Sequence, residues 1–190
     1  SDYESNKISF DTVAQEKLAA YSKASATVDS FNTKYMSDTG VTAEDNAKAQ
    51  LTSKQAQLDA LILKGKGGDN DSDFDESKLT DEEKEQYKTL TSSVETLKSD
   101  IANYDTAKKS MEDLKNYVNI EVKDGKTTVS ALKETDSAAG VANIAAETAD
   151  RNTKIKADLT TQYQNKAKNS YDMINAVHKF SKGASRKVGQ

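Results

Sequence analysis

The sequence 81-DEEKEQYKTLTSSVETLKSDIANYDTAKKSMEDLKNYV-118 carries the most regular repeat of the chain. Counted from Tyr87 in alternating steps of three and four, its positions are apolar except Lys108 and Lys115: Tyr87, Leu90, Val94, Leu97, Ile101, Tyr104, Met111 and Val118. This spacing places the apolar side chains on one stripe of a helix, as in a coiled coil. We expect a helix about 57 Å long that needs a second long helix to cover its stripe.

A second segment of matching length follows at residues 143–182. Its stripe is apolar except at Thr148 and Asn152, which predict looser packing near its amino-terminal end. We expect the two long helices to form an antiparallel coiled coil over residues 81–190. The predicted seam consists of Leu90, Val94, Leu97, Ile101, Tyr104 and Met111 facing Ile155, Leu159, Tyr163, Tyr171, Ile174 and Val177.

A β-hairpin is predicted between the long helices, at about residues 117–131. Residues 117–122 alternate in polarity, Asp124-Gly125 supplies a turn, and β-branched residues resume at Thr127. Asp-Gly between two such runs is a strong hairpin signal. Because an isolated hairpin is marginally stable in water, we expect it to lie against the helices.

Residues 1–64 predict a helical hairpin. Apolar and small residues recur at helical spacing from Phe10 to Tyr35, and again from Ala47 to Ile62. The intervening Gly40 is suited to end one helix, and Thr42 is suited to cap the next. A connection this short favours two antiparallel helices.

Residues 65–80 are rich in glycine and then in acids, and we interpret them as an exposed linker between residues 1–64 and 81–190. A calcium-binding loop is the alternative. The sixth position of an EF-hand loop needs glycine, but it is Glu76 or Phe74 in the two possible registers. The solvated loop is therefore the favoured interpretation. The fold class is mainly α and elongated, with a small β insertion.

The residue inventory argues against catalysis. The chain has no cysteine and one histidine, His178, and it lacks the Gly-rich sequence of a phosphate loop. A thiol nucleophile, a Cys-ligated zinc and an oriented Ser-His-Asp set are therefore not expected. We predict no enzyme activity, no catalytic residues, no cofactor, no metal and no small-molecule substrate. The absence of proline suits long helices.

The charges are separated along the chain. Residues 151–190 hold nine bases and two acids, a net charge of +7, whereas residues 69–85 carry a net charge of −7. Such a bipolar molecule can associate head to tail, acidic region against basic. The simpler alternative is that the bases complement the helix carboxyl end and aid solubility. Nucleic-acid binding is disfavoured because the chain is acidic overall, with a net charge of −4.

Two segments carry a family resemblance: 113-DLKNYVNIEVKDG-125, and 150-DRNTKIKADLTT-161 with its continuation 171-YDMINAVHKF-180. The first resembles the helix-to-hairpin transition of EspA-like filament proteins of type III secretion needles. The second is similar to the terminal helix of those proteins and of the V-antigen and IpaD-like tip proteins. The helical hairpin at residues 1–64 also looks like the self-chaperoning hairpin of IpaD-like tips.

The resemblance implies a secreted structural protein at the bacterial cell surface. It would be a subunit of a needle tip or needle-extending filament that mediates host contact and effector delivery. Implied partners are other copies of the chain, the needle subunit and host-membrane translocon proteins. The implied assembly contacts are Lys179, Lys182, Arg186 and Lys187. The alternative is a soluble adaptor or chaperone-like coiled coil that clasps a partner helix.

Overall fold

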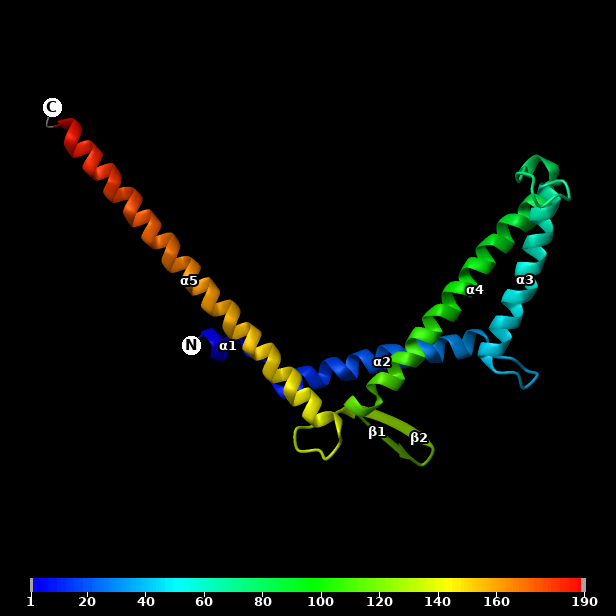
Figure 1. Ribbon diagram of the computed structural model, residues 1–190. Coiled ribbons are helices and arrows are strands. Elements are labelled where there is room, and N and C mark those ends of the chain that lie inside the picture. The colour runs from blue at the N-terminus through cyan, green and yellow to red at the C-terminus, as the bar shows by residue number, and fades with distance from the viewer. Residues whose placement is uncertain (1, 189–190) are drawn as a thin grey trace.

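The computed structural model describes the backbone of residues 2–188 and the side chains of residues 2–183. It is mainly α-helical with one small β-hairpin, as predicted, and forms an open V (Figure 1). One arm is a pair of helices, the other is a single long helix, and a further helix crosses the base. The elements are α1 (Asp2–Asn6), α2 (Phe10–Lys34), α3 (Ala43–Gly65), η1 (Glu76–Lys78), α4 (Asp81–Leu114), η2 (Lys115–Tyr117), β1 (Val118–Lys123), β2 (Lys126–Ala131) and α5 (Gly140–Val188).

Side-chain caps fix where the first three long helices begin. The hydroxyls of Ser9, Thr42 and Thr80 each accept a hydrogen bond from the backbone N–H three residues later, at 3.1–3.2 Å. Glu83 also accepts from the backbone N–H of Thr80 at 2.9 Å, which completes a capping box. These bonds satisfy amide groups that have no partner within the helix, so local sequence sets the start of α2, α3 and α4.

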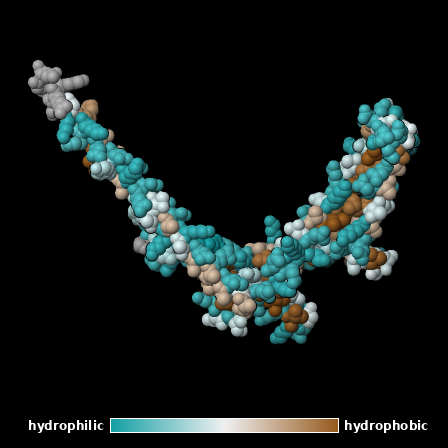
Figure 2. Space-filling view, viewed as in Figure 1, coloured by the Kyte–Doolittle hydropathy of each residue, from teal (hydrophilic) through white to brown (hydrophobic). Residues whose placement is uncertain are grey.

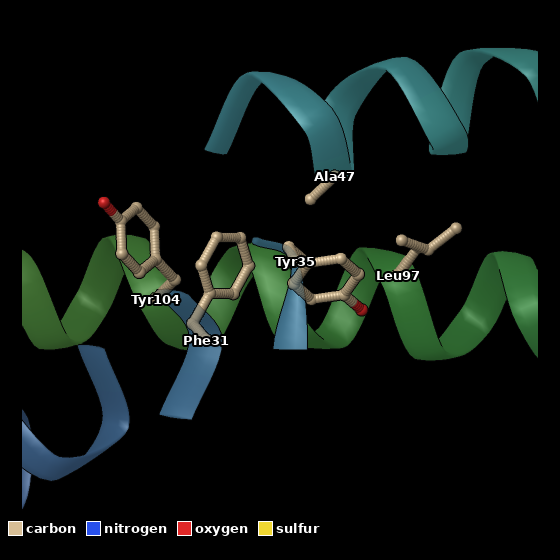
Figure 3. Packing of buried hydrophobic residues seen from close by; sticks show 5 residues of the cluster. All are labelled: Phe31, Tyr35, Ala47, Leu97 and Tyr104. Atoms are coloured by element: carbon tan, nitrogen blue, oxygen red, sulfur yellow. The ribbon is translucent and has the colours of Figure 1, made fainter. Parts of the chain in front are cut away.

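The central core lies where the end of α2 and the start of α3 meet the middle of α4 (Figure 3). Phe31 of α2 stacks on Tyr104 of α4, with ring centroids 4.1 Å apart and an interplanar angle of 20°. Ala47 of α3 is fully buried and allows close approach of the helices. Tyr35 and Leu97 complete the buried cluster.

The predicted antiparallel pairing of the two long helices is wrong. α4 packs chiefly on α2 and α3, and α5 instead contacts α1, α2 and η2 before it leads away from α4 (Figure 1). Val94, Leu97 and Tyr104 are buried, but they face the amino-terminal helices rather than α5. A heptad repeat requires a partner helix without specifying which one, and here α2 and α3 cover the stripe of α4.

The predicted amino-terminal hairpin also differs in detail. α2 and α3 touch near their connection, but each packs more extensively on α4. α3 and α4 lie side by side and antiparallel, forming the two-helix arm of the V (Figure 1). The proposed unit 1–64 therefore shares its core with residues 81–114, and its separation into a domain of its own stays a prediction.

The loop between α3 and α4 is ordered by a few apolar contacts. Phe74 stacks on Tyr87 with centroids 5.1 Å apart, and Leu79 is buried. The N–H of Asp75 donates to the carbonyl of Gly65 at 2.9 Å. A Cβ on Gly65 would lie 2.3 Å from the Phe74 ring, which explains the glycine. The acidic residues of the predicted linker are largely exposed, and the segment connects α3 to α4 at the tip of the two-helix arm. Its role as a linker between two domains stays a prediction.

The β-hairpin forms where it was predicted. Val118 pairs with Ala131 and Lys123 with Lys126, and Asp124 and Gly125 both have positive φ, at 53° and 73°. These angles are those of a tight turn whose twist matches the strands. A second core lies at its base, joining the start of α2, the end of β2 and the start of α5; its buried members are Val13, Ala14, Leu132 and Ile144.

Gly140, the first residue of α5, lies against the backbone of η2. A Cβ at this position would be 2.0 Å from the carbonyl oxygen of Asn116, and backbone atoms cannot move aside easily. We therefore expect Gly140→Ala to lower the free energy of unfolding. The control is Gly183→Ala in the same helix, which has open space around it and should raise helix content slightly. Urea unfolding and circular dichroism would compare them; equal stability of the two variants would contradict this account.

A polar contact closes the edge of the central core. Lys34 Nζ lies 2.7 Å from Asp100 Oδ2, and the Tyr35 hydroxyl donates to the same oxygen at 2.6 Å. The Lys34 ammonium and the Tyr35 hydroxyl both hold the pKa of Asp100 below its usual value. Burial and the bond to Asp100 raise the pKa of Tyr35. The carboxylate therefore joins the carboxyl end of α2 to the middle of α4.

We expect Asp100→Ala to lower the free energy of unfolding by about 1–2 kcal/mol at pH 7, because the Tyr35 hydroxyl loses its acceptor. A lowered folded-state pKa contributes stability that is complete above the unfolded value of about 3.9 and is lost as the pH falls through the folded value. The difference between wild type and Asp100→Ala should therefore shrink below about pH 4. Denaturant titrations across pH would measure it. Exposed Glu95→Ala in the same helix is the control, and an equal loss in both variants would refute the assignment.

Candidate interaction surface on α5

The first turns of α5 are fixed to the body of the molecule by buried groups and by directed hydrogen bonds. Ile144 is fully buried, and the Thr148 hydroxyl donates to its carbonyl at 2.7 Å. The side-chain amide of Asn152 accepts from the N–H of Ile8 at 2.8 Å and donates to the carbonyl of Ile8 at 3.0 Å. The expectation that Thr148 and Asn152 loosen this region is wrong, because their polar atoms have partners.

Ion pairs connect α5 to α2 and set the direction of its axis. Arg151 makes two bonds to the carboxylate of Glu16, at 2.5 and 2.9 Å, and Lys17 lies 2.9 Å from Glu147. The hydrogen bonds from Arg151 lower the pKa of Glu16. A bidentate guanidinium–carboxylate pair is geometrically specific, so it resists rotation of α5 about its base.

The short helix α1 covers the next part of α5. The Tyr163 hydroxyl donates to the carboxylate of Asp2, and Lys156 lies over the ring of Tyr3 at 5.7 Å. Ile155 and Leu159 are partly buried beneath this segment. Tyr163 itself is 54% exposed, and the cover ends at this turn.

Beyond Tyr163, α5 projects as a free rod (Figure 1). Every residue from 164 to 183 except Asn175 is exposed. At about 100° per residue, one face of this segment continues the stripe that begins at Ile144. The exposed apolar side chains on or beside this face are Tyr163, Tyr171, Met173, Ile174, Val177 and Phe180, and the last is 79% exposed. We call these six residues the α5 stripe.

The lysines of the rod are spread around the helix. At about 100° per residue, Lys168 and Lys179 lie on the face away from Val177, Lys166 lies on the same side as Val177, and Lys182 lies beside Tyr171. Lys168 is 3.5 Å from Asp172, its neighbour one turn away. Of the predicted assembly contacts, Lys179 and Lys182 are exposed. The side chains of Arg186 and Lys187 lie outside the described residues.

The structure thus divides the predicted seam into two surfaces. Its α4 members, from Leu90 to Met111, lie in or beside the cores formed with α2 and α3, whereas its members on α5 beyond Leu159 face solvent. Met173 and Phe180 were missed by the sequence analysis. Their signal was present, because both lie four or fewer residues from Val177 on one helical face.

Other candidate sites are weak. Among the described residues, no group of three or more Asp, Glu, His or Cys side chains is arranged to hold a metal ion. His178 is exposed on α5. In the described part of the chain, no helix combines the length and the hydrophobicity needed to cross a membrane. Comparisons of the chain with protein-family models, with curated proteins and with solved structures found no match.

Two isoleucine-to-alanine substitutions compare how much the base and the free part of α5 contribute to the free energy of unfolding. Ile144→Ala removes a fully buried side chain and should lower the free energy of unfolding by about 3 kcal/mol. Ile174→Ala alters a side chain that is 66% exposed and should change the free energy of unfolding by less than about 0.5 kcal/mol. Denaturant unfolding of dilute protein gives both values. A large loss for Ile174→Ala in the monomer would mean that the stripe is covered within the chain.

Proposed function

We propose that this chain is a non-catalytic structural subunit that assembles with other copies of itself through the free part of α5. The observation that carries the proposal is the length of exposed α5 that presents large apolar side chains. In proteins most helical stability comes from packing an apolar face against other parts of the structure rather than from helix propensity. An exposed apolar surface of this kind marks an interaction site.

The energetic reason for association is direct. Fully burying a large apolar side chain contributes about 1.5–3 kcal/mol relative to leaving it in water. At about 100° per residue, Tyr163, Ile174 and Val177 of the α5 stripe lie within about 60° of one another, so one partner helix would bury them together, whereas Tyr171 and Phe180 lie at its two edges. The ion pairs from Glu16 and Glu147 hold the base of the rod in place, which limits the entropy lost when the rod binds.

A more specific function follows from the sequence resemblance. The segments that resemble EspA-like and IpaD-like proteins include the β-hairpin and α5, so we propose a secreted subunit of a type III secretion needle tip or filament. In such an assembly the coiled coil involving α5 would form between copies, because α4 is already covered by α2 and α3. The needle subunit and translocon proteins would be further partners at the cell surface.

The second candidate is an adaptor that clasps a helix of another protein. The same stripe favours it, because an exposed apolar helix face accepts any helix of complementary pattern. The two candidates differ in stoichiometry. Self-assembly depends on the concentration of the chain alone, whereas an adaptor remains monomeric until its partner is added.

Sedimentation velocity over a range of concentrations, with electron microscopy of the same samples, tests self-assembly. We expect the sedimentation coefficient to rise with concentration for the wild type. The double variant Ile174→Ser/Val177→Ser should remain monomeric with an unchanged midpoint of urea unfolding, since both side chains are exposed in the monomer. A wild type that is monomeric at the highest soluble concentration would overturn the proposal and favour the adaptor.

A further inference from the structure

We propose that the α5 stripe of one copy docks on the α3/α4 arm of a second copy, with the basic end of α5 against the acidic loop at the tip of that arm. This inference rests on the proposed self-assembly and identifies the surface that receives α5. The contact is heterologous, since donor and acceptor are different parts of the chain. Repetition of such a contact gives a ring or an open filament.

The arm has an open face suited to a third helix. A groove of about 670 Å³ lies between α3 and α4 near the tip, and one of about 350 Å³ lies nearer the central core. Among the residues that line the two grooves, one row on each helix is spaced by three and four residues, the pattern of a coiled-coil face. On α3 this row is Gln50, Lys54, Gln57, Leu61 and Lys64, and on α4 it is Gln86, Thr89, Ser93 and Thr96.

The acceptor face is partly apolar. Leu61 and Leu90 line the outer groove from the two helices, with Ala60 beside them. On the side visible in Figure 2, hydrophobic residues follow the arm in a band, whereas most of α5 is hydrophilic on that side. Small side chains such as Ala60, Thr89 and Ser93 allow another helix to approach closely. The arm therefore offers apolar contact at Ala60, Leu61 and Leu90, between polar side chains that line the rest of the groove.

Length and charge favour a second copy as the occupant. The free segment 164–188 is about 38 Å long and α3 is about 35 Å long. The loop and first turn at the outer end of the groove, residues 69–85, carry a net charge of −7, and Asp71 and Asp73 are exposed there. Lys179 and Lys182 are exposed near the end of α5, and Lys182 lies beside Tyr171 at the edge of the α5 stripe, so it can face the loop while the stripe lies in the groove. When the basic end of α5 lies next to the acidic loop, where α4 of the neighbour begins, α5 runs antiparallel to that α4.

Two other arrangements fit less well. α5 cannot reach its own arm while Arg151 binds Glu16 and Asn152 binds the backbone of Ile8, because these bonds direct α5 away from α4. Pairing of α5 with α5 through the stripe brings together segments of the same sign: residues 164–183 hold four lysines and one acid, and Lys166 and Lys182 lie on or beside the stripe. Like charges at such a contact oppose association.

Charge reversal tests the proposed orientation. Lys179→Glu/Lys182→Glu alone, and Asp71→Lys/Asp73→Lys alone, should each weaken self-association about tenfold or more, measured by sedimentation equilibrium at low salt. All four changes in one chain should restore self-association. Lys123→Glu/Lys126→Glu at the hairpin is the control and should leave it unchanged. Failure of the combined variant to recover would overturn the proposed pairing.

Cysteine cross-linking tests the acceptor directly, since the natural chain has no cysteine. A mixture of Thr89→Cys and Val177→Cys chains should give a mixed disulfide dimer under mild oxidation, whereas Glu121→Cys with Val177→Cys should not. A dominant Val177–Val177 cross-link in an assembling sample would overturn the acceptor but leave self-assembly intact. A wild type that never assembles would overturn both proposals, so the two failures are distinguishable.

Discussion

The stacking of Phe31 on Tyr104, with Tyr35 and Ala47 beside it, holds α2 and α3 on the apolar stripe of α4. This junction determines the rest of the arrangement, because α2 and α3 together cover the apolar stripe of α4 within the chain. α2 and α3 occupy that stripe, so α5 finds no partner on α4. It extends from the second core instead, and its own stripe remains exposed.

α2 contributes residues to both cores and so links them. Its carboxyl end carries Phe31 and Tyr35 of the central core, and its amino end carries Val13 and Ala14 of the core under α5. Ion pairs from the same helix to Arg151 and Glu147 then fix the direction of α5. The V shape is therefore a consequence of one helix that packs against different partners at its two ends.

The proposed assembly follows from the same division. A compact monomer would have used the stripe of α5 to complete its own core. Here the monomer has a two-helix arm with an open face, and a free basic helix of similar length. The two parts are complementary in pattern and in charge, but they belong to different arms of the V. Their union requires a second molecule.

By itself, the sequence determined the elements and much of their boundaries. The cap at Thr42, the Asp124-Gly125 turn and the heptad spacing of α4 act over a few residues, so they could be read correctly without tertiary information. The α5 stripe was also partly recognised, through Tyr163, Tyr171, Ile174 and Val177. Which helices meet is set by tertiary contacts. An apolar stripe favours burial against another helix but does not specify which one. The pairing of helices depended on the fit of Phe31, Ala47 and Tyr104 and on the bonds that turn α5 away from α4.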